Sequence, residues 1–166
     1  VILELARILN ASPPPIGITL VLFGREDMGR SGNPKSYAQG SLAFAKDLPI
    51  EKPDEAIILD MIGDAELHIP IERYSFQQNR QLVKKLWGLA KVLSLDAFES
   101  RIVYTLYDDH VPLWDEARIP AIDIIDFNYP NSYANYWHTT QDLPEHCSAE
   151  SLGQVGTLLV HYIYGR

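Results

Sequence analysis

The sequence predicts an α/β fold with a mostly parallel sheet that helices cover on both faces. Two observations predict it: short apolar runs alternate with stretches of helical apolar spacing, and the runs are apolar throughout rather than at every second position. Strands of that kind are buried on both faces, which is typical of parallel sheets between layers of helices. The 166 residues are 46% hydrophobic and contain no repeat or linker, so residues 1–166 are predicted to form one domain.

The predicted elements follow one another along the chain. Apolar residues at positions 2, 3, 5, 6 and 9 have the spacing of a buried helix over residues 1–10, which the prolines after Ser12 end. Continuous runs with β-branched residues predict four strands, at residues 18–23, 56–62, 101–106 and 121–126. Further helices are predicted near residues 38–47, 79–95, 111–118 and 149–164. The last helix is predicted to start at the cap residue Ser148 and to bury Leu152, Val155, Leu159 and Ile163.

Charge and composition exclude some classes of function. The formal net charge is −8 and the pI is about 5.0, which argues against a nucleic-acid partner, because phosphates require a basic face. The same negative charge leaves room for a bound cation. Cys147 is the single cysteine, so no internal disulfide can form, and no apolar run is long enough to span a membrane.

Polar residues of catalytic type follow the ends of all four predicted strands. In chain order they are Glu26 and Asp27, then Asp60, then Asp108, Asp109 and His110, and finally His138, which lies beside Trp137 in the stretch "NYWHTTQDLP". Binding sites of open α/β sheets lie in the crevice outside the carboxyl ends of the strands. A single aspartate there is more often a turn or cap residue, and a single histidine is more often a surface residue, so the prediction depends on the whole set.

The acids of this set require a cation if they share one crevice. Asp60 interrupts the apolar stretch "IILDMIG", and a buried carboxylate is costly unless it is paired or bound to a metal. Several carboxylates that face one another raise each other's pKa values or bind a divalent ion. An all-oxygen site would suit calcium or magnesium, whereas Asp and Glu together with His138 favour zinc. The chain has no G-x-S-x-G, H-E-x-x-H, C-x-x-C or P-loop motif that would indicate other chemistry.

Five stretches together resemble a known family. "LELARIL", "VLFGREDMG", "ILDMIGD", "YDDHVPLWDEARIPAIDII" and "YWHTTQDLPE" occur in the order found in the M28 zinc exopeptidases, and within them in the branch that contains animal-type glutaminyl cyclases. The resemblance covers nearly the whole chain. It implies the zinc-exopeptidase (phosphorylase/hydrolase-like) fold, a peptide N-terminus as substrate, one or two zinc ions, and a secreted or periplasmic location.

The resemblance also implies a role for each candidate residue. Glu26 is similar to the catalytic proton shuttle of the family, and Asp27 to the metal ligand that follows it, although a glutamate is common there. Asp60 matches an aspartate that binds a second zinc in the aminopeptidases and joins a hydrogen-bond network over a single zinc in the cyclases. The other roles are an acid of that same network for Asp108, supporting residues for Asp109 and His110, the last zinc ligand for His138, and the indole of the substrate pocket for Trp137.

One departure from the family concerns the start of the chain. In the family, a strand with a histidine ligand and a segment with an aspartate ligand precede the helix with which this chain begins. We therefore expect the chain to be the C-terminal two-thirds of the family domain, with the first strands and two zinc ligands before Val1. Such a piece is expected to be catalytically silent and to self-associate through its exposed apolar sheet edge.

The sequence leaves two classes of function open. The first is a zinc-dependent enzyme that acts on peptide N-termini, either as an aminopeptidase (a hydrolase with two zinc ions) or as a glutaminyl cyclase (an acyltransferase with one). In the cyclase, Glu26 would carry a proton from the α-amine to the departing ammonia. The second is a non-catalytic M28-like binding domain.

Overall fold

Helices and short strands alternate along the chain in the computed structural model, which describes residues 1–165. The helices are α1 (Ile2–Ala11), α2 (Gln39–Lys46), α3 (Arg73–Gln78), α4 (Arg80–Val92), α5 (His110–Ala117) and α6 (Ala149–Tyr164). The strands are β1 (Ala56–Asp60), β2 (Ile69–Ile71), β3 (Phe98–Ile102), β4 (Ala121–Ile125), β5 (Pro130–Asn131) and β6 (Ala134–Asn135). Two single 3₁₀ turns lie at Pro34–Ser36 and Pro144–His146.

The strands form two parallel pairs and one small antiparallel hairpin. β1 and β4 run parallel, with Ala56 opposite Ala121 and Asp60 opposite Ile125. β2 and β3 are also parallel, whereas β5 and β6 are antiparallel. Parallel pairing joins strands through a connection that contains helices, and α3, α4 and α5 lie between β1 and β4 in the sequence. The predicted α/β class with parallel strands is confirmed.

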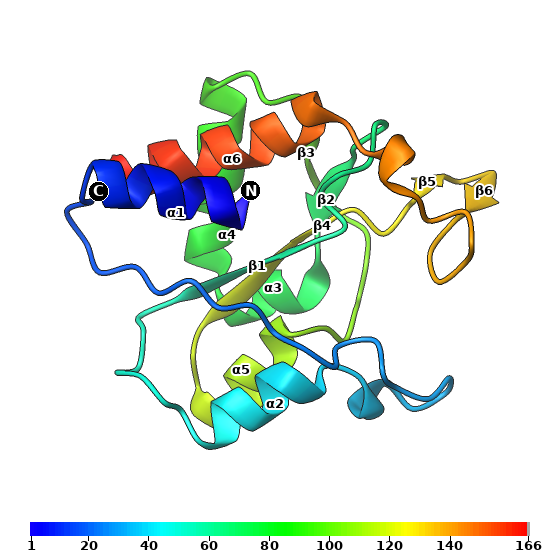
Figure 1. Cartoon of the computed structure of the whole chain (residues 1–166), viewed down its shortest axis with the longest axis horizontal. Coiled ribbons are helices and arrows are strands. Elements are labelled where there is room, and N and C mark those ends of the chain that lie inside the picture. The colour runs from blue at the N-terminus through cyan, green and yellow to red at the C-terminus, as the bar shows by residue number, and fades with distance from the viewer. Residues whose placement is uncertain (166) are drawn as a thin grey trace.

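Helices cover both faces of the β1–β4 pair (Figure 1). On one face, Ile57 and Leu59 of β1 and Ile122 and Ile124 of β4 pack into a core with α1, α4 and α6. On the opposite face, Ala56 and Ile58 of β1 and Ala121 of β4 pack into a second core with Leu113 of α5 and Ala45 of α2. This alternation follows from the two-residue period of a strand. Because β1 and β4 are parallel, their carboxyl ends lie at the same edge of the pair.

Two predicted strands need correction. Residues 18–23 are extended, but no other strand pairs with them within residues 1–165, and Leu22 is 74% exposed. A β-branched apolar run forms a strand only where a second strand satisfies its backbone, and β1 pairs only with β4. The strand expected at 101–106 begins earlier, at Phe98, because the backbone of Ile69 bonds to Ala97 and sets the register.

The second predicted strand ends early and is less buried than expected. It stops at Asp60 because Met61 takes a left-handed conformation, with φ of 50°. All five residues of β1 are half-buried, whereas all five of β4 are buried. β1 is therefore an edge strand among the described residues.

The predicted helices are confirmed, and one helix was not predicted. The Oγ atom of Ser148 accepts hydrogen bonds from the backbone N–H groups of Glu150 (3.1 Å) and Ser151 (3.4 Å), so it caps α6 as expected. Val155, Leu159 and Ile163 are buried, but Leu152 is only half-buried. Sequence spacing missed α3, a six-residue helix too short for a periodic signal. Within residues 1–165, no helix combines the length and apolarity that crossing a bilayer requires.

Candidate metal and catalytic site

The loop after residue 24 presents Glu26 and Asp27 because its two ends are tied together. The backbone N–H of Ala38 donates to the carbonyl of Glu26 at 3.0 Å, just ahead of α2. Gly40, in the first turn of α2, touches Gly24 so closely that an added Cβ would lie 2.1 Å from the Gly24 carbonyl oxygen. Only glycine permits such an approach, so this position holds the start of the loop against the helix.

The middle of the site comes from β1 and from the N-terminus of α5. Asp60 is the last residue of β1, and α5 begins at His110 with Asp109 at its N-cap position. Asp108, Asp109 and His110 are buried, with exposed fractions of 6%, 7% and 0%. The hydroxyl of Ser41 in α2 donates to Asp109 Oδ1 at 2.6 Å and ties the two helices together at the site.

The loop that follows β4 is rich in aromatic residues, and it brings His138 to Asp27, which lies 111 residues earlier in the chain. His138 Nε2 and Asp27 Oδ1 are 2.7 Å apart. The indole of Trp137 stacks on the imidazole with ring centroids 3.9 Å apart, and Phe127 packs edge-on against the indole at 5.2 Å. The structure therefore places His138 beside Asp27, with an aromatic wall formed by Trp137 and Phe127.

Three residues at the site have left-handed backbone conformations without being glycine. Arg25 precedes Glu26 with φ of 59°, Met61 follows Asp60 with φ of 50°, and His138 itself has φ of 57°. Such conformations are unfavourable for residues with a Cβ and are enriched at functional sites. Each of them redirects the chain where a candidate side chain must face the others.

The acids raise one another's pKa values. Burial and then the charges of Asp108, Asp27, Asp60 and Asp109 raise the pKa of Glu26 to about 8. Burial and then Asp108 raise the pKa of Asp60 to about 7, against a weaker lowering by the backbone N–H of Met61. Burial likewise raises the pKa of Asp109 to about 6, although the bond from Ser41 opposes it. The candidate acids therefore form one electrostatically coupled cluster.

The kinds of ligand atoms at this site suit a zinc ion better than their number does. A carboxylate and an imidazole are ligands that zinc prefers, and tetrahedral ligands at 2.0–2.2 Å would stand roughly 3.3 Å apart. Asp27 Oδ1 and His138 Nε2, at 2.7 Å, would have to separate by less than an ångström. However, residues 1–165 contain no group of three or more His, Cys, Asp or Glu side chains positioned to hold a metal ion. The ligand roles of Asp27, Asp60 and His138 stay predictions.

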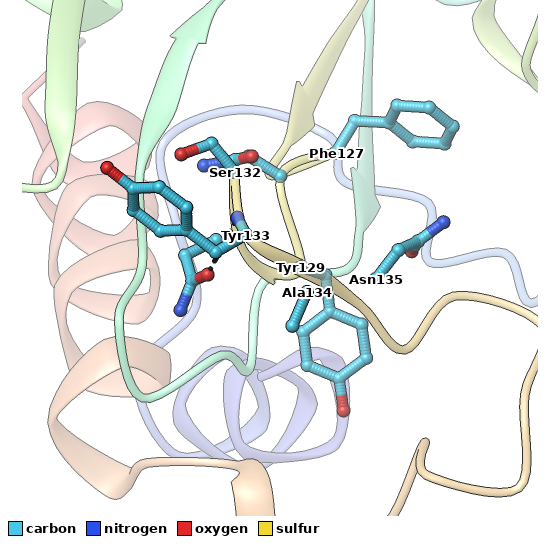
Figure 2. A pocket seen from close by; sticks show the side chains of 8 residues that line it. Phe127, Tyr129, Ser132, Tyr133, Ala134 and Asn135 are labelled. Atoms are coloured by element: carbon cyan, nitrogen blue, oxygen red, sulfur yellow. Dashed lines mark hydrogen bonds between the residues drawn. The ribbon is translucent and has the colours of Figure 1, made fainter.

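A cavity of about 320 Å³ is lined by Phe127, Tyr129 and residues of the β5–β6 hairpin (Figure 2), and none of the candidate acids is in its lining. Its lining comes from a single stretch of chain, residues 127–135, which includes the β5–β6 hairpin. Phe127 lines the cavity and also packs against Trp137, so the cavity adjoins the aromatic side of the site. Asparagine side chains and tyrosines give it a polar lining without an ionisable carboxylate.

Comparison with known proteins identifies the family. The model of Peptidase family M28 matches residues 1–163. The chain belongs to this family. Aminopeptidase YwaD of Bacillus subtilis (strain 168) is 29% identical over 174 residues, which cover 99% of this chain and 35% of that protein. The family predicted from the five sequence stretches is confirmed.

Solved structures of this M28 chain's relatives have the same fold. Glutaminyl cyclase of Porphyromonas gingivalis superposes with a TM-score of 0.91 at 30% identity, over 97% of this chain and 60% of that chain. A Zn-dependent exopeptidase from Parabacteroides distasonis superposes with a TM-score of 0.90 at 28% identity, over 99% of this chain and 60% of that chain. The M28 chain thus spans 35% of the curated relative and about 60% of these two solved chains.

Three residues of the site escaped prediction from the sequence. Asp123 is buried in the middle of β4, where burial and then the charges of Asp108 and Asp60 raise its pKa well above the usual value. The signal that singled out Asp60, an aspartate inside an apolar strand, is equally present in "AIDII". Glu72 and Ser41 are buried polar residues as well, but they lie in local sequence that looks like ordinary helix starts.

Proposed function

We propose that the protein that contains this M28 chain is a zinc-dependent enzyme acting on the N-termini of peptides. The single observation that carries the proposal is the contact of Asp27 with His138 at 2.7 Å beside Glu26, whose pKa is raised to about 8 by burial and neighbouring acids. A carboxyl group with that pKa exchanges a proton near neutral pH, as a general acid and base must. Family membership and the names of the relatives support the same proposal.

The residues of this chain have distinct tasks in the proposed reaction. Asp27 and His138 would hold the zinc ion, with Asp60 as a further ligand or as a neighbour that hydrogen-bonds at the site. Bound zinc supplies a Lewis acid that polarises a carbonyl group or acidifies water. Glu26 would carry the proton between substrate atoms, because burial and then the negative charge of Asp108 keep its pKa high. Trp137 and Phe127 form an apolar wall for the substrate side chain.

Two reactions fit these tasks, and the relatives carry both names. An aminopeptidase would use Glu26 to take a proton from water, whereas a glutaminyl cyclase would use it to pass the proton of the α-amine to departing ammonia. Counting the bound zinc ions and testing two substrates distinguish the two reactions. Turnover of a peptide with N-terminal leucine and two bound zinc ions supports the aminopeptidase, and cyclisation of an N-terminal glutamine with one zinc ion supports the cyclase.

Variants of three residues test the proposal. In the full-length protein, Glu26→Gln is expected to abolish turnover with zinc still bound, because it removes the proton carrier but none of the proposed ligands. His138→Ala is expected to lower zinc affinity, measured by equilibrium dialysis. His161→Ala is the matched control, since His161 is an exposed histidine on α6. Unchanged zinc affinity in the His138 variant would refute the metal site, and unchanged turnover in the Glu26 variant would refute its proton transfer.

A second candidate is a non-catalytic M28-like binding domain. The observation that favours it is that no three ligating side chains are grouped within residues 1–165. This candidate predicts peptide binding that does not depend on zinc and is not followed by turnover, and calorimetry with and without a chelator measures it. A secreted or periplasmic location is a further proposal, which rests on the family resemblance and is tested by cell fractionation.

A further inference from the structure

A fully buried carboxylate next to the candidate site has more partners than the capping of a helix N-terminus requires. Glu72 has an exposed fraction of 0% and occupies the N-cap position of α3. Ser, Thr, Asp and Asn are the usual residues at that position, because a short side chain suffices to reach the first turn. A glutamate has one methylene more, which suggests that its carboxylate also serves partners outside α3.

The partners of Glu72 come from three segments of the chain. Oε2 accepts hydrogen bonds from the backbone N–H (2.7 Å) and the hydroxyl (2.9 Å) of Ser75, and Oε1 accepts one from the N–H of Tyr74 at 3.0 Å. Oε1 also accepts from the N–H of Leu106 at 3.0 Å, and His110 Nε2 lies 3.1 Å from Oε2. Capping of α3 requires only the first set, so the contacts with Leu106 and His110 serve another purpose.

These contacts keep Glu72 ionised. Burial by itself raises the pKa of Glu72, but His110 and the donors of α3 outweigh it, so the pKa lies below the usual value. A carboxylate can only accept hydrogen bonds, so at 3.1 Å the carboxylate of Glu72 favours the form of His110 that has a proton on Nε2. The other ring nitrogen, Nδ1, then faces Asp123 Oδ2 at 3.6 Å.

Both outer contacts of Glu72 lead directly to Asp108. Leu106 lies two residues before Asp108 and His110 lies two residues after it, so the carboxylate holds the chain on both sides. Ser75 extends the network, because its hydroxyl accepts a hydrogen bond from the backbone N–H of Asp123 at 2.9 Å. Asp108 is the charge that most raises the pKa values of Glu26 and Asp60 after burial.

We propose that Glu72 is a positioning residue of the acidic cluster, which fixes the ring of His110 and the place of Asp108 between its two anchored neighbours. The catalytic role that this positioning would give to Asp108 rests on the proposed function. The anchoring itself does not, and it is measured on the chain without any substrate or metal.

The first variant, Glu72→Gln, replaces one carboxylate oxygen by an NH₂ group. That group cannot accept. At the Oε1 position it would face two backbone donors, the N–H groups of Tyr74 and Leu106, whereas at the Oε2 position it would face one, the N–H of Ser75, together with His110. The least costly arrangement places it against His110, whose Nε2 then becomes an acceptor while the proton moves to Nδ1, on the side of Asp123. The other groups that face this ring are the Asp109 carboxylate and the ring of Tyr74 at 6.5 Å, and neither offers Nε2 a second acceptor at hydrogen-bond distance.

The second variant, Glu72→Asp, separates capping from positioning. Aspartate is a favoured N-cap and retains the charge, so α3 should remain capped. Its side chain is one methylene too short to keep the contacts with Leu106 and His110 as well. Asn79→Ala is the matched control, because it removes the cap of the adjoining helix α4, a bond from Leu82 N–H at 3.1 Å, without touching the site.

Two measurements at neutral pH decide the proposal. Nitrogen NMR of the His110 ring is expected to show a protonated Nε2 in the original chain and in Asn79→Ala, and an unprotonated Nε2 in Glu72→Gln. Amide hydrogen exchange at residues 106–111 is expected to become about tenfold faster in Glu72→Asp than in the original chain, while the core amides of α6 are unchanged. The proposal is overturned if both variants leave the His110 ring and residues 106–111 as they were, or if exchange accelerates equally in α6.

Discussion

Gly40→Ala is expected to destabilise the domain and to disturb the site, although alanine is the better helix former. Gly40 lies in the first turn of α2, where its added Cβ would stand 2.1 Å from the carbonyl oxygen, 3.0 Å from the nitrogen and 3.2 Å from the carbonyl carbon of Gly24. All three atoms belong to the backbone, so none can rotate away. The loop or the helix must therefore move by more than an ångström to restore ordinary contact.

The size of the effect follows from two opposing contributions. Alanine gains up to about 1 kcal/mol over glycine inside a helix, whereas overpacking of this kind costs about 1–3 kcal/mol. With the full gain subtracted, the expected net change in the free energy of unfolding is a loss of up to about 2 kcal/mol, or a few degrees in Tm for a domain of this size. Because residue 24 leads directly into the loop, the distance between Asp27 and His138 should change as well.

Gly88→Ala is the matched control. Gly88 lies in the interior of α4 on an exposed face, and nothing would lie within 4 Å of its added Cβ. This variant is expected to raise the free energy of unfolding by about 0.5–1 kcal/mol. Urea denaturation of both variants, with zinc affinity measured beside it, tests the argument. If Gly40→Ala stabilised the domain as Gly88→Ala does and left zinc affinity unchanged, the close contact between Gly24 and α2 would not position the loop.

Three further predictions concern charge and association. The metal-free domain is expected to be more stable at about pH 5 than at about pH 8, by a few kcal/mol at most. The pKa values of Glu26 and Asp60 are raised to about 8 and about 7 in the folded state, so the protons that stabilise the folded state are lost as pH rises through these values. Thermal unfolding measured at several pH values tests this expectation, and added zinc should reduce the difference in stability between about pH 5 and about pH 8. Asp123→Asn is expected to change the free energy of unfolding at pH 7 by less than about 1 kcal/mol, because burial keeps Asp123 protonated and asparagine has nearly the same shape. If urea denaturation showed a loss of stability above about 3 kcal/mol, the carboxyl group of Asp123 would have to be charged in the folded state. Leu22→Lys is expected to reduce self-association of the chain, since Leu22 is 74% exposed on an extended segment that has no partner strand within residues 1–165. Sedimentation that stays the same as in the original chain would contradict this.

Helices were predictable from this sequence because their signals are local. The apolar spacing of α4 and the cap of α6 lie within the elements themselves, and the structure has both helices within a few residues of the predicted bounds. Strands depend on partners elsewhere in the chain. Residues 18–23 have the composition of a strand but lack a partner within residues 1–165, whereas β2, with three residues, forms because β3 lies beside it.

The same distinction separates the parts of the site that were predicted from those that were missed. Glu26, Asp27, Asp60 and His138 could be selected because each follows an apolar run, and the carboxyl ends of parallel strands meet at one edge. Glu72 could not be selected in this way, because its task depends on Leu106 and His110, more than thirty residues away. Only Asp123 had a local signal that was overlooked.

The site therefore has an inner part and an outer part with different physical characters. The inner part, around Glu72, His110 and Asp123, has exposed fractions of 0%. Glu72 is held by the hydrogen bonds that it accepts, and His110 lies between Glu72 and Asp123 at 3.1 and 3.6 Å. The outer part is exposed: the side chains of Asp27 and His138 are 61% and 37% accessible and come from two loops. A surface pair of this kind adds little stability by itself. A cation bound there would be attracted by the ionised carboxylate of Glu72, whereas Asp123 is protonated and adds no charge to the inner part. Removing the charge of Glu72 should therefore weaken zinc binding at the proposed ligands Asp27 and His138, which equilibrium dialysis would measure.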